Sequence, residues 1–172
     1  MVVRLGRVGR CVSGGRAAAG GCVPAEVAVE YLPGHGQQVG FGERLLHQGH
    51  VRVEPALGAG WYDLGPAPGQ VGSAIIVGHV DWSGHAGVFY RLRDLKPGAQ
   101  INVTRADGSV AVFRVSSIQE FPKTAFPTTL VYGNTAYAGL RLVTCGGAFN
   151  SKLHSYDDDI VAFAELVPPS NT

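Results

Sequence analysis

The sequence predicts an all-β domain, either a barrel or a sandwich, over residues 49–172. Short apolar runs in this part are separated by glycine, proline and asparagine, at the spacing that is typical of strands. Helical periodicity is nearly absent, which also favours the all-β fold class. The chain has 172 residues, a length that suits one compact domain with an appendage rather than two full domains.

Six segments carry the strand prediction, through continuous apolar runs or through alternation of apolar and polar residues. They are residues 51–54, 73–78, 101–104, 109–115, 140–144 and 160–164. Asp107-Gly108 lies between the third and the fourth, and this dipeptide favours the positive φ angles of a tight hairpin. Residues 87–95, which precede Pro97-Gly98, are the one segment for which we predict a short helix.

Residues 1–48 differ from the rest of the chain, because they are rich in glycine and arginine and have almost no periodic apolar pattern. We therefore predict that this segment is poorly ordered. Its arginines precede small residues that end at Cys22, as in a basic export leader, but the apolar centre of such a leader is missing. No segment reaches the ~18–20 apolar residues of a membrane-spanning helix, so we expect no transmembrane span in this chain.

Composition and charge exclude several classes of protein. Hydrophobic residues make up 45% and charged residues 16%, so the chain can bury a core and does not have the composition of a disordered protein. The 14 basic and 13 acidic residues leave a net charge of +1, so we expect no nucleic-acid partner. The cysteines Cys11, Cys22 and Cys145 cannot all pair within one chain, and none lies in a CxxC or zinc-binding pattern.

Cys145 is the strongest candidate for a reactive residue. It ends an apolar run and precedes two glycines, so we expect its side chain at a strand edge that a bound peptide can approach. A thiol with a pKa of ~8.5 is only a few per cent thiolate at pH 7, so catalysis needs a base or a cation beside it. The alternative interpretation is a small buried hydrophobic residue without chemistry.

His79 is the candidate for that base. The apolar run before it also ends in a Gly-His turn, which places an imidazole at the end of a second strand. The alternative is a hydrogen-bonded loop histidine. His79, Asp81 and His85 are also spaced closely enough to share a metal ion, but no fourth ligand is evident, and we predict no metal site.

Three sequence segments and their separation point to a family. Ser73-Ala-Ile-Ile-Val-Gly-His79-Val-Asp-Trp and Gly87-Val-Phe-Tyr-Arg-Leu are followed by Leu140-Arg-Leu-Val-Thr-Cys145-Gly-Gly-Ala-Phe-Asn, and then by Tyr156. This pattern closely resembles the sortases, and most closely the class F sortases of actinobacteria, which Gly60-Trp61-Tyr62 also fits. The resemblance covers residues 51–166.

The resemblance implies a sortase-like twisted β-barrel with one or two short helices, on the outer face of a Gram-positive membrane. It implies a cysteine transpeptidase or hydrolase that cleaves a C-terminal Leu-Pro-x-Thr-Gly-like signal of surface proteins and transfers it to an amine of the cell wall or of a pilin. By the same resemblance, Cys145 attacks the threonine carbonyl, His79 protonates the leaving amine, and Thr144 lines the groove and helps hold the oxyanion. No cofactor is implied.

Sortases also use an arginine, usually after the cysteine, to position the substrate carbonyl. This chain has no arginine beyond Arg141, and Asp157 or Asp158 stands where the resemblance places a basic residue. Arg141 shares a strand face with Cys145 but lies about 13 Å away along a regular strand. We take Arg141 as the candidate, with a solvated strand arginine as the alternative and Lys152 as a weaker substitute.

Ordinary pKa values already predict a slow enzyme. With a thiol near 8.5 and an imidazole near 6.5, the thiolate–imidazolium pair is populated at only about one per cent.

Two other functions stay open. One is an L,D-type transpeptidase that crosslinks peptidoglycan, although its nucleophile lies in a different Ser-His-Gly-Cys run. The other is a catalytically impaired β-barrel that binds peptides.

Overall fold

Most of the described chain, residues 2–5, 26–30, 59–62, 64–105 and 107–168, forms β-strands in the computed structural model. The strands of the main sheet are β1 (Val2–Leu5), β2 (Glu26–Glu30), β3 (Ala59–Trp61), β4 (Gly72–Gly78), β7 (Gln100–Thr104), β8 (Val110–Pro122), β9 (Ala138–Asn150) and β10 (Ser155–Leu166). A small separate hairpin consists of β5 (Asp81–Trp82) and β6 (His85–Ala86). The described helices are η1 (Leu92–Asp94) and η2 (Lys123–Ala125), both of the 3-10 type, and α1 (Thr128–Tyr132).

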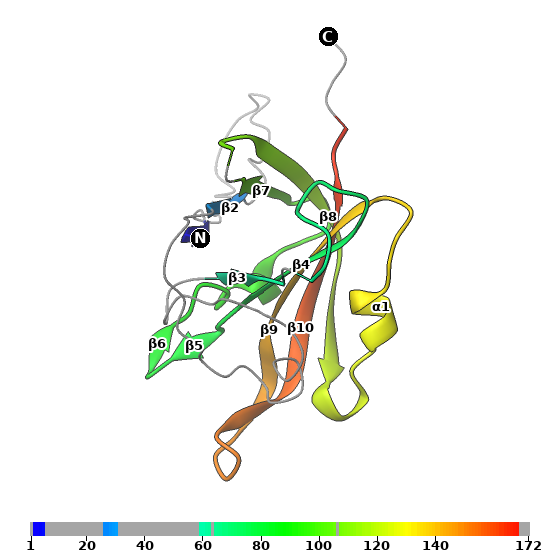
Figure 1. Cartoon of the computed structure of the whole chain (residues 1–172). Helices are drawn as coiled ribbons and strands as arrows, with labels where there is room; N and C mark the ends of the chain where they lie inside the picture. Colours follow the sequence, from blue (N-terminus) through cyan, green and yellow to red (C-terminus); the bar gives the residue numbers. More distant parts are fainter. Residues whose placement is uncertain (1, 6–25, 31–58, 63, 106, 169–172) are drawn as a thin grey trace, which may run out of the picture.

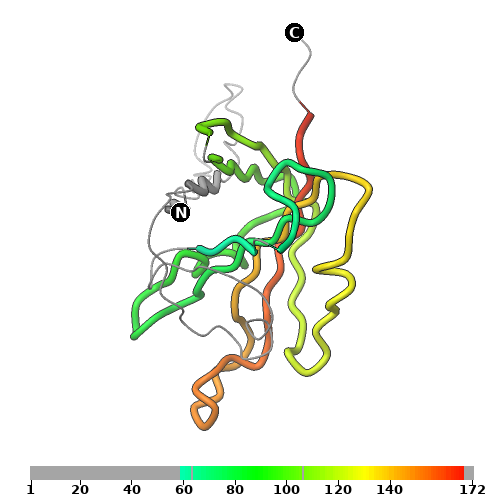
Figure 2. Tube along the Cα trace, in the orientation of Figure 1, coloured from blue at the N-terminus to red at the C-terminus, as the bar shows by residue number. Residues whose placement is uncertain are grey.

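The main sheet has the spatial order β1-β2-β7-β8-β10-β9-β4-β3 and curls into a half-barrel (Figure 1). β2 pairs with β7 and β4 pairs with β9 in parallel, whereas the other neighbours are antiparallel. The all-β, barrel-like fold class predicted from the sequence is therefore confirmed. Figure 2 shows the β9–β10 hairpin, in orange, projecting from one end of the curled sheet.

Five of the six predicted strands lie in the described residues, and all five are present. The strands predicted at 109–115, 140–144 and 160–164 are parts of the longer β8, β9 and β10. These strands continue into polar sequence because each is paired along its length, β10 with both β8 and β9. The predicted strand 51–54 and most of the predicted poorly ordered segment 1–48 lie outside the described residues, apart from β1 and β2.

The predicted hairpin between β7 and β8 is present, with Thr104 paired to Val110. Gly108 has the expected positive φ, +80°. Asp107 contributes differently from the prediction, because its carboxylate accepts hydrogen bonds from the backbone N–H and the hydroxyl of Ser109. These bonds lower the pKa of the exposed Asp107 carboxyl, the side-chain bond most strongly.

The helical piece of one or two turns predicted within residues 87–95 is present as η1, a single turn of 3-10 type. The residues before η1 are not helical. They are held by the segment after β4, where the N–H of Phe89 donates to the carbonyl of His79 at 2.9 Å. The segment therefore serves as a packed turn that buries Phe89 and Leu92. η2 and α1 were not predicted, because helices of three and five residues are too short to give a periodic signal.

Side chains alternate between two hydrophobic clusters, one on each face of the sheet. On β9, Leu140 and Leu142 belong to the larger cluster, together with Phe89 and Phe113, whereas Val143 belongs to the smaller one with Phe163. Because successive strand residues point to opposite faces, Arg141 and Cys145 share the face of Val143, and Thr144 shares the face of Leu142. This alternation decides which side chains can meet the thiol.

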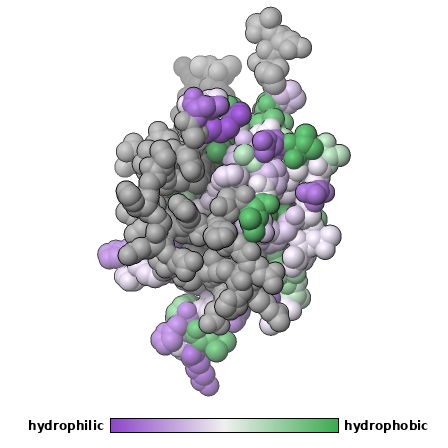
Figure 3. Space-filling model, viewed as in Figure 1, coloured by the Kyte–Doolittle hydropathy of each residue, from purple (hydrophilic) through white to green (hydrophobic). Residues whose placement is uncertain are grey.

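On the face shown in Figure 3, the coloured residues mix hydrophilic and hydrophobic groups. At the tip of the β9–β10 hairpin, the exposed Lys152 is followed by Leu153, which is 72% exposed. No helix of the described residues is long and apolar enough to cross a membrane.

Candidate active site

Cys145 lies inside β9, five residues before its end, and not at the strand end that the sequence suggested. Its register partner on β10 is Asp159. The pairing of the two strands becomes irregular directly after this point, between Tyr156 and Asp158 on β10. The thiol is partly exposed and has no disulfide partner. The thiol therefore lies where the regular pairing of β9 with β10 gives way to the irregular part of the β9–β10 hairpin.

Gly147 makes this change of direction possible. Its φ is +74°, a conformation that L side chains rarely adopt, and a Cβ there would lie 2.5 Å from Oδ2 of Asp158. The sequence suggested that the two glycines let a peptide approach. The structure shows a different reason for glycine at position 147. The positive φ and the close approach of Asp158 on β10 each disfavour a side chain there.

His79 follows the last residue of β4, and β4 lies beside β9 in parallel. The last paired residues are Val77 and Val143, so two further residues on each strand bring His79 level with Cys145. Neighbouring strands are about 4.8 Å apart, and residues two apart share a face. The backbone thus brings His79 and Cys145 to the same end of neighbouring strands.

His79 is buried and tightly packed. The residue is 6% exposed, and its ring centroid lies 4.9 Å from that of Trp82. A Cβ at Gly87 would lie 2.3 Å from the carbonyl oxygen of His79, so only glycine fits there. Burial lowers the pKa of His79 to about 4, although the nearby charge of Asp81 acts in the opposite direction. The imidazole is therefore neutral at pH 7.

Asp81 connects the small hairpin to the main sheet. Its carboxylate accepts a hydrogen bond from the hydroxyl of Tyr156 on β10. This bond is the main reason why the pKa of Tyr156 is raised to about 12. The alternative of a metal site at His79, Asp81 and His85 gains no support, since no three His, Cys, Asp or Glu side chains gather suitably within the described residues.

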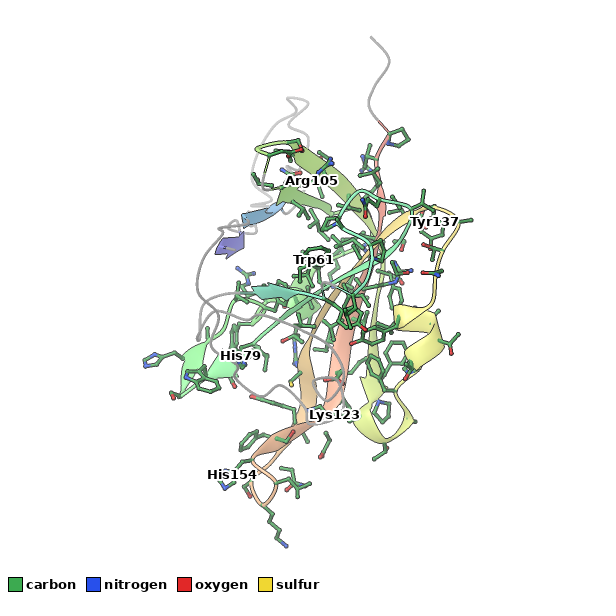
Figure 4. The ribbon with its side chains drawn as sticks, viewed as in Figure 1. Trp61, His79, Arg105, Lys123, Tyr137 and His154 are labelled. Carbon is green, nitrogen blue, oxygen red and sulfur yellow. The ribbon has the colours of Figure 1, made fainter. Side chains whose placement is uncertain are left out.

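Lys123, the first residue of η2, approaches the thiol from β8. Its Nζ donates to Sγ of Cys145 at 3.5 Å and to Oγ of Ser155 at 3.0 Å. Figure 4 shows Lys123 and His79 in the same half of the molecule, with Arg105 and Tyr137 in the other half.

Burial dominates the acidity of the groups around the thiol. It raises the pKa of Cys145; the charge of Lys123 works against this shift, and the carboxylates of Asp159 and Asp81 add to it. Burial also raises the pKa of Asp159 to about 6, again opposed by Lys123. The thiol and the imidazole are thus both pushed toward their neutral forms, so the ion pair is rarer than the one per cent expected from ordinary values.

The structure does not bring Arg141 to the thiol. Its guanidinium lies over the ring of Phe163, with Cζ 4.7 Å from the centroid, and Nη1 donates to the carbonyl of Leu140 at 3.1 Å. A Cβ at Gly139 would lie 3.1 Å from Nη1, so the side chain extends along β9 away from Cys145. Arg141 is also not the solvated strand arginine of the alternative interpretation, as it is only 3% exposed.

Thr144 is buried at 1% exposure, on the opposite sheet face from Cys145. Its hydroxyl has no hydrogen-bond partner among the described residues. Thr144 and Cys145 are neighbours in sequence, but alternation along the strand directs their side chains to opposite faces.

The family model for the Sortase domain matches residues 38–167, which is more than half of the chain. The chain belongs to the sortase family. Among solved structures, this sortase-family chain is similar to sortase A from Corynebacterium diphtheriae, with 21% identity and a TM-score of 0.54 over 67% of this chain and 50% of that one. It is also similar to SrtA sortase from Actinomyces oris, with 21% identity and a TM-score of 0.53 over 83% of this chain and 71% of that one.

Sortase C1 from Streptococcus agalactiae is a third similar structure, with 14% identity and a TM-score of 0.53 over 67% of this chain and 56% of that one. The sortase-family chain therefore spans about half of two of these three structures, whose likeness shows the fold. Among curated proteins, none matches the chain.

Three residues of the site were not found by sequence reasoning: Lys123, Ser155 and Asp159. Lys123 lies 22 positions before Cys145 and belongs to no motif. Only the neighbouring order of β8, β10 and β9 brings these residues together. A correct prediction of the length of β8 would have placed Lys123 near the thiol, because Pro122 pairs with Asp158.

Replacing Gly147 by alanine tests the backbone requirement beside the thiol. We expect Gly147→Ala to lower the free energy of unfolding by on the order of 1–3 kcal/mol more than Gly108→Ala does. Both glycines have positive φ, but a Cβ at Gly108 would meet nothing within 4 Å, so the control isolates the clash with Asp158. Urea denaturation measures both values. Equal losses would contradict the close-approach argument.

The Asp159→Asn variant tests the raised pKa of Asp159. The carboxyl binds its proton more tightly in the folded state, with a pKa of about 6 against an ordinary 3.8, so its contribution to stability falls as pH rises across this range. The free energy of unfolding of Asp159→Asn minus that of the parent should therefore increase between pH 4 and 7, by on the order of 1–3 kcal/mol.

Denaturant titrations at several pH values provide this difference, and the contribution of His79 cancels because both proteins share it. Asp157→Asn removes an exposed carboxylate from the same strand and is the matched control. A difference for Asp159→Asn that is constant with pH, or that decreases, would show that the pKa of Asp159 is not raised.

Proposed function

We propose that this sortase-family chain is a cysteine transpeptidase in which Cys145 and His79 act on a Leu-Pro-x-Thr-Gly-like sorting signal. The observation that carries the proposal is the parallel register of β4 and β9, which brings His79 level with a partly exposed Cys145. A thiol nucleophile beside an imidazole is the arrangement that acyl transfer from a peptide requires.

The proposed reaction has two halves. The proton of the Cys145 thiol passes to the imidazole of His79, and the thiolate attacks the threonine carbonyl of the signal. The tetrahedral intermediate collapses when the C–N bond breaks, and the imidazolium gives its proton to the departing glycine amine. An incoming amine of the cell wall or of a pilin then attacks the thioacyl group and gives a proton to His79. The C–S bond breaks, and the proton returns from His79 to the Cys145 thiolate.

The packing of His79 supports the role of proton carrier. Trp82 packs against the ring, Gly87 lies close to the backbone of His79, and burial keeps the imidazole neutral so that it can accept the thiol proton. We give no catalytic contact to the side chains of Arg141 and Thr144, because the first extends toward Phe163 and the second lies on the other face of the sheet. The Cys-Gly-Gly and Gly-His-Val-Asp motifs favour class F and, with it, action on the outer face of an actinobacterial membrane.

A second candidate function is peptide binding without turnover. Asp159 pairs with Cys145 at the strand position beside the nucleophile, and its negative charge opposes formation of a thiolate. A protein with this arrangement could hold a sorting signal while cleaving it too slowly to matter. The two candidates differ in whether the thiol forms a bond to the substrate.

Cleavage of a quenched Leu-Pro-x-Thr-Gly peptide, with a glycine amine as acceptor, separates the two candidates. We expect slow turnover by the parent and a loss of at least about 10³-fold in Cys145→Ala, since removing a nucleophile removes the covalent route. Mass spectrometry should show a thioacyl adduct on Cys145 in the parent. Cys11→Ala is the control that leaves this thiol in place. Peptide binding without turnover would favour the second candidate, and turnover that survives in Cys145→Ala would exclude the first.

The dependence of kcat/KM on pH tests the Cys145–His79 pair independently. A rising limb near pH 4 is expected from His79, and a falling limb above the ordinary thiol value of ~8.5 from Cys145, with a broad plateau between them. Burial causes this breadth by moving the two pKa values apart. Initial rates across pH 3.5–10.5, with circular dichroism to confirm the fold, measure the profile. A narrow maximum near pH 7.5 would mean that both groups titrate as they do in water.

A further inference from the structure

We infer that Lys123 is a catalytic residue of this site, and that its ammonium stabilises the Cys145 thiolate in place of an arginine after the cysteine. The inference rests on the proposed function for the reaction it serves. Its physical basis is the contact between Nζ of Lys123 and Sγ of Cys145, 3.5 Å long, which joins a cation directly to the reacting atom.

A second hydrogen bond fixes the position of the ammonium. Nζ of Lys123 also donates to Oγ of Ser155 at 3.0 Å, and the Ser155 hydroxyl donates in turn to the carbonyl of Tyr156 at 3.3 Å. The serine oxygen therefore keeps a lone pair directed at the lysine. Held at two points, the ammonium is oriented before any substrate binds, which is the condition under which a charge is most effective in an active site.

The charges around the thiol leave this role to Lys123. Asp159 on β10 and Asp81 on β5 are the carboxylates that raise the pKa of Cys145, and Lys123 is the cation that lowers it. Tyr156 also interacts with the thiol, and it is uncharged at pH 7. The lysine thus offsets the negative charges that would otherwise keep the sulfur protonated.

Two further carboxylates flank the backbone just beyond the thiol. Oε1 of Glu120 on β8 would lie 3.0 Å from a Cβ at Gly146, and Oδ2 of Asp158 lies beside Gly147. Lys123 follows Pro122 at the end of β8. Lys123 precedes the nucleophile in sequence, and its ammonium reaches the site from the end of β8, across β10. The chain has no arginine beyond Arg141 that could supply a positive charge from the other direction.

In the proposed reaction, Lys123 keeps its proton throughout. The proton of Cys145 moves to His79, the thiolate forms beside the ammonium, and the charge then passes to the carbonyl oxygen of the tetrahedral intermediate. The ammonium stabilises the thiolate before attack and after release of product. No proton is transferred to or from Lys123, so Lys123→Arg should preserve the effect, whereas an uncharged side chain should not.

The test measures the acidity of Cys145 directly, without any peptide substrate. The rate of alkylation by iodoacetamide is followed from pH 6 to 10, by mass spectrometry of the peptide that contains Cys145, because Cys11 and Cys22 also carry thiols. For Lys123→Met we expect a higher thiol pKa and a rate at pH 8 that is lower by about three- to tenfold. For Lys123→Arg we expect a rate within about twofold of the parent.

Lys152→Met is the matched control, since it removes an exposed ammonium from the β9–β10 hairpin and should leave the rate unchanged. If Lys123→Met does not fold, Lys123→Gln replaces it as the uncharged variant. A thiol pKa that is the same in the parent and in a folded uncharged variant would overturn the role of Lys123. So would an equal shift in Lys152→Met, because it would reflect total charge alone.

Peptide cleavage then separates this inference from the proposed function. We expect kcat to fall at least about tenfold in Lys123→Met, with KM within about threefold of the parent, and to recover in Lys123→Arg. The thiol pKa could differ between the parent and Lys123→Met while the parent cleaves no peptide. That outcome would support the thiolate contact and overturn the transpeptidase function. Cleavage that is equally fast in parent and Lys123→Met would overturn the catalytic role of the lysine.

Discussion

The site depends on one constraint, the pairing of β9 with a parallel neighbour on one side and an antiparallel neighbour on the other. The parallel β4–β9 ladder sets the level of His79 relative to Cys145, and the antiparallel β9–β10 ladder sets Asp159 against the same thiol. A register slip of one residue in either ladder would turn every side chain of that strand to the other face. Buried side chains on both faces of β9 oppose such a slip, because Leu142 fills one cluster and Val143 the other. The hydrophobic core therefore fixes the geometry of the polar groups.

The same burial that fixes the geometry also opposes ionisation. A thiol and an imidazole that are largely removed from solvent are both driven to their neutral forms, and the carboxylates of Asp81 and Asp159 add to the effect on the thiol. In this site the cost is reduced by a single ammonium, that of Lys123, within hydrogen-bonding distance of the sulfur. A buried carboxyl with a pKa of about 6 beside this lysine is a further sign that negative charge is unfavourable here. The balance favours a slow enzyme whose nucleophile is ionised only briefly.

The sequence predicted the parts of this protein that are encoded locally. Alternating residues and glycine-bounded apolar runs were sufficient for the five described strands and for the β7–β8 hairpin, where Gly108 has the expected backbone conformation. His79 and Cys145 could be chosen because each follows or lies within such a run. Lys123 and Asp159 could not, since their relation to the thiol arises only from the order of β8, β10 and β9 in the sheet. Arg141 was chosen from its spacing, but the spacing gives only the face of the strand. Its guanidinium lies over Phe163, its register partner on β10, and Nη1 lies back toward Gly139.

A comparison of Arg141 with Lys123 explains why strand parity alone is a weak guide to catalytic residues. Arg141 has the right face and the right charge, yet four residues along a strand separate it from the sulfur by about 13 Å. Lys123 is two strands away from β9 in the sheet order but begins the turn after β8, and neighbouring strands are only about 4.8 Å apart. A long side chain crosses one intervening strand more easily than it runs back along its own. Cations that serve a strand-borne nucleophile are therefore to be sought at the ends of nearby strands before they are sought on the nucleophile's own strand.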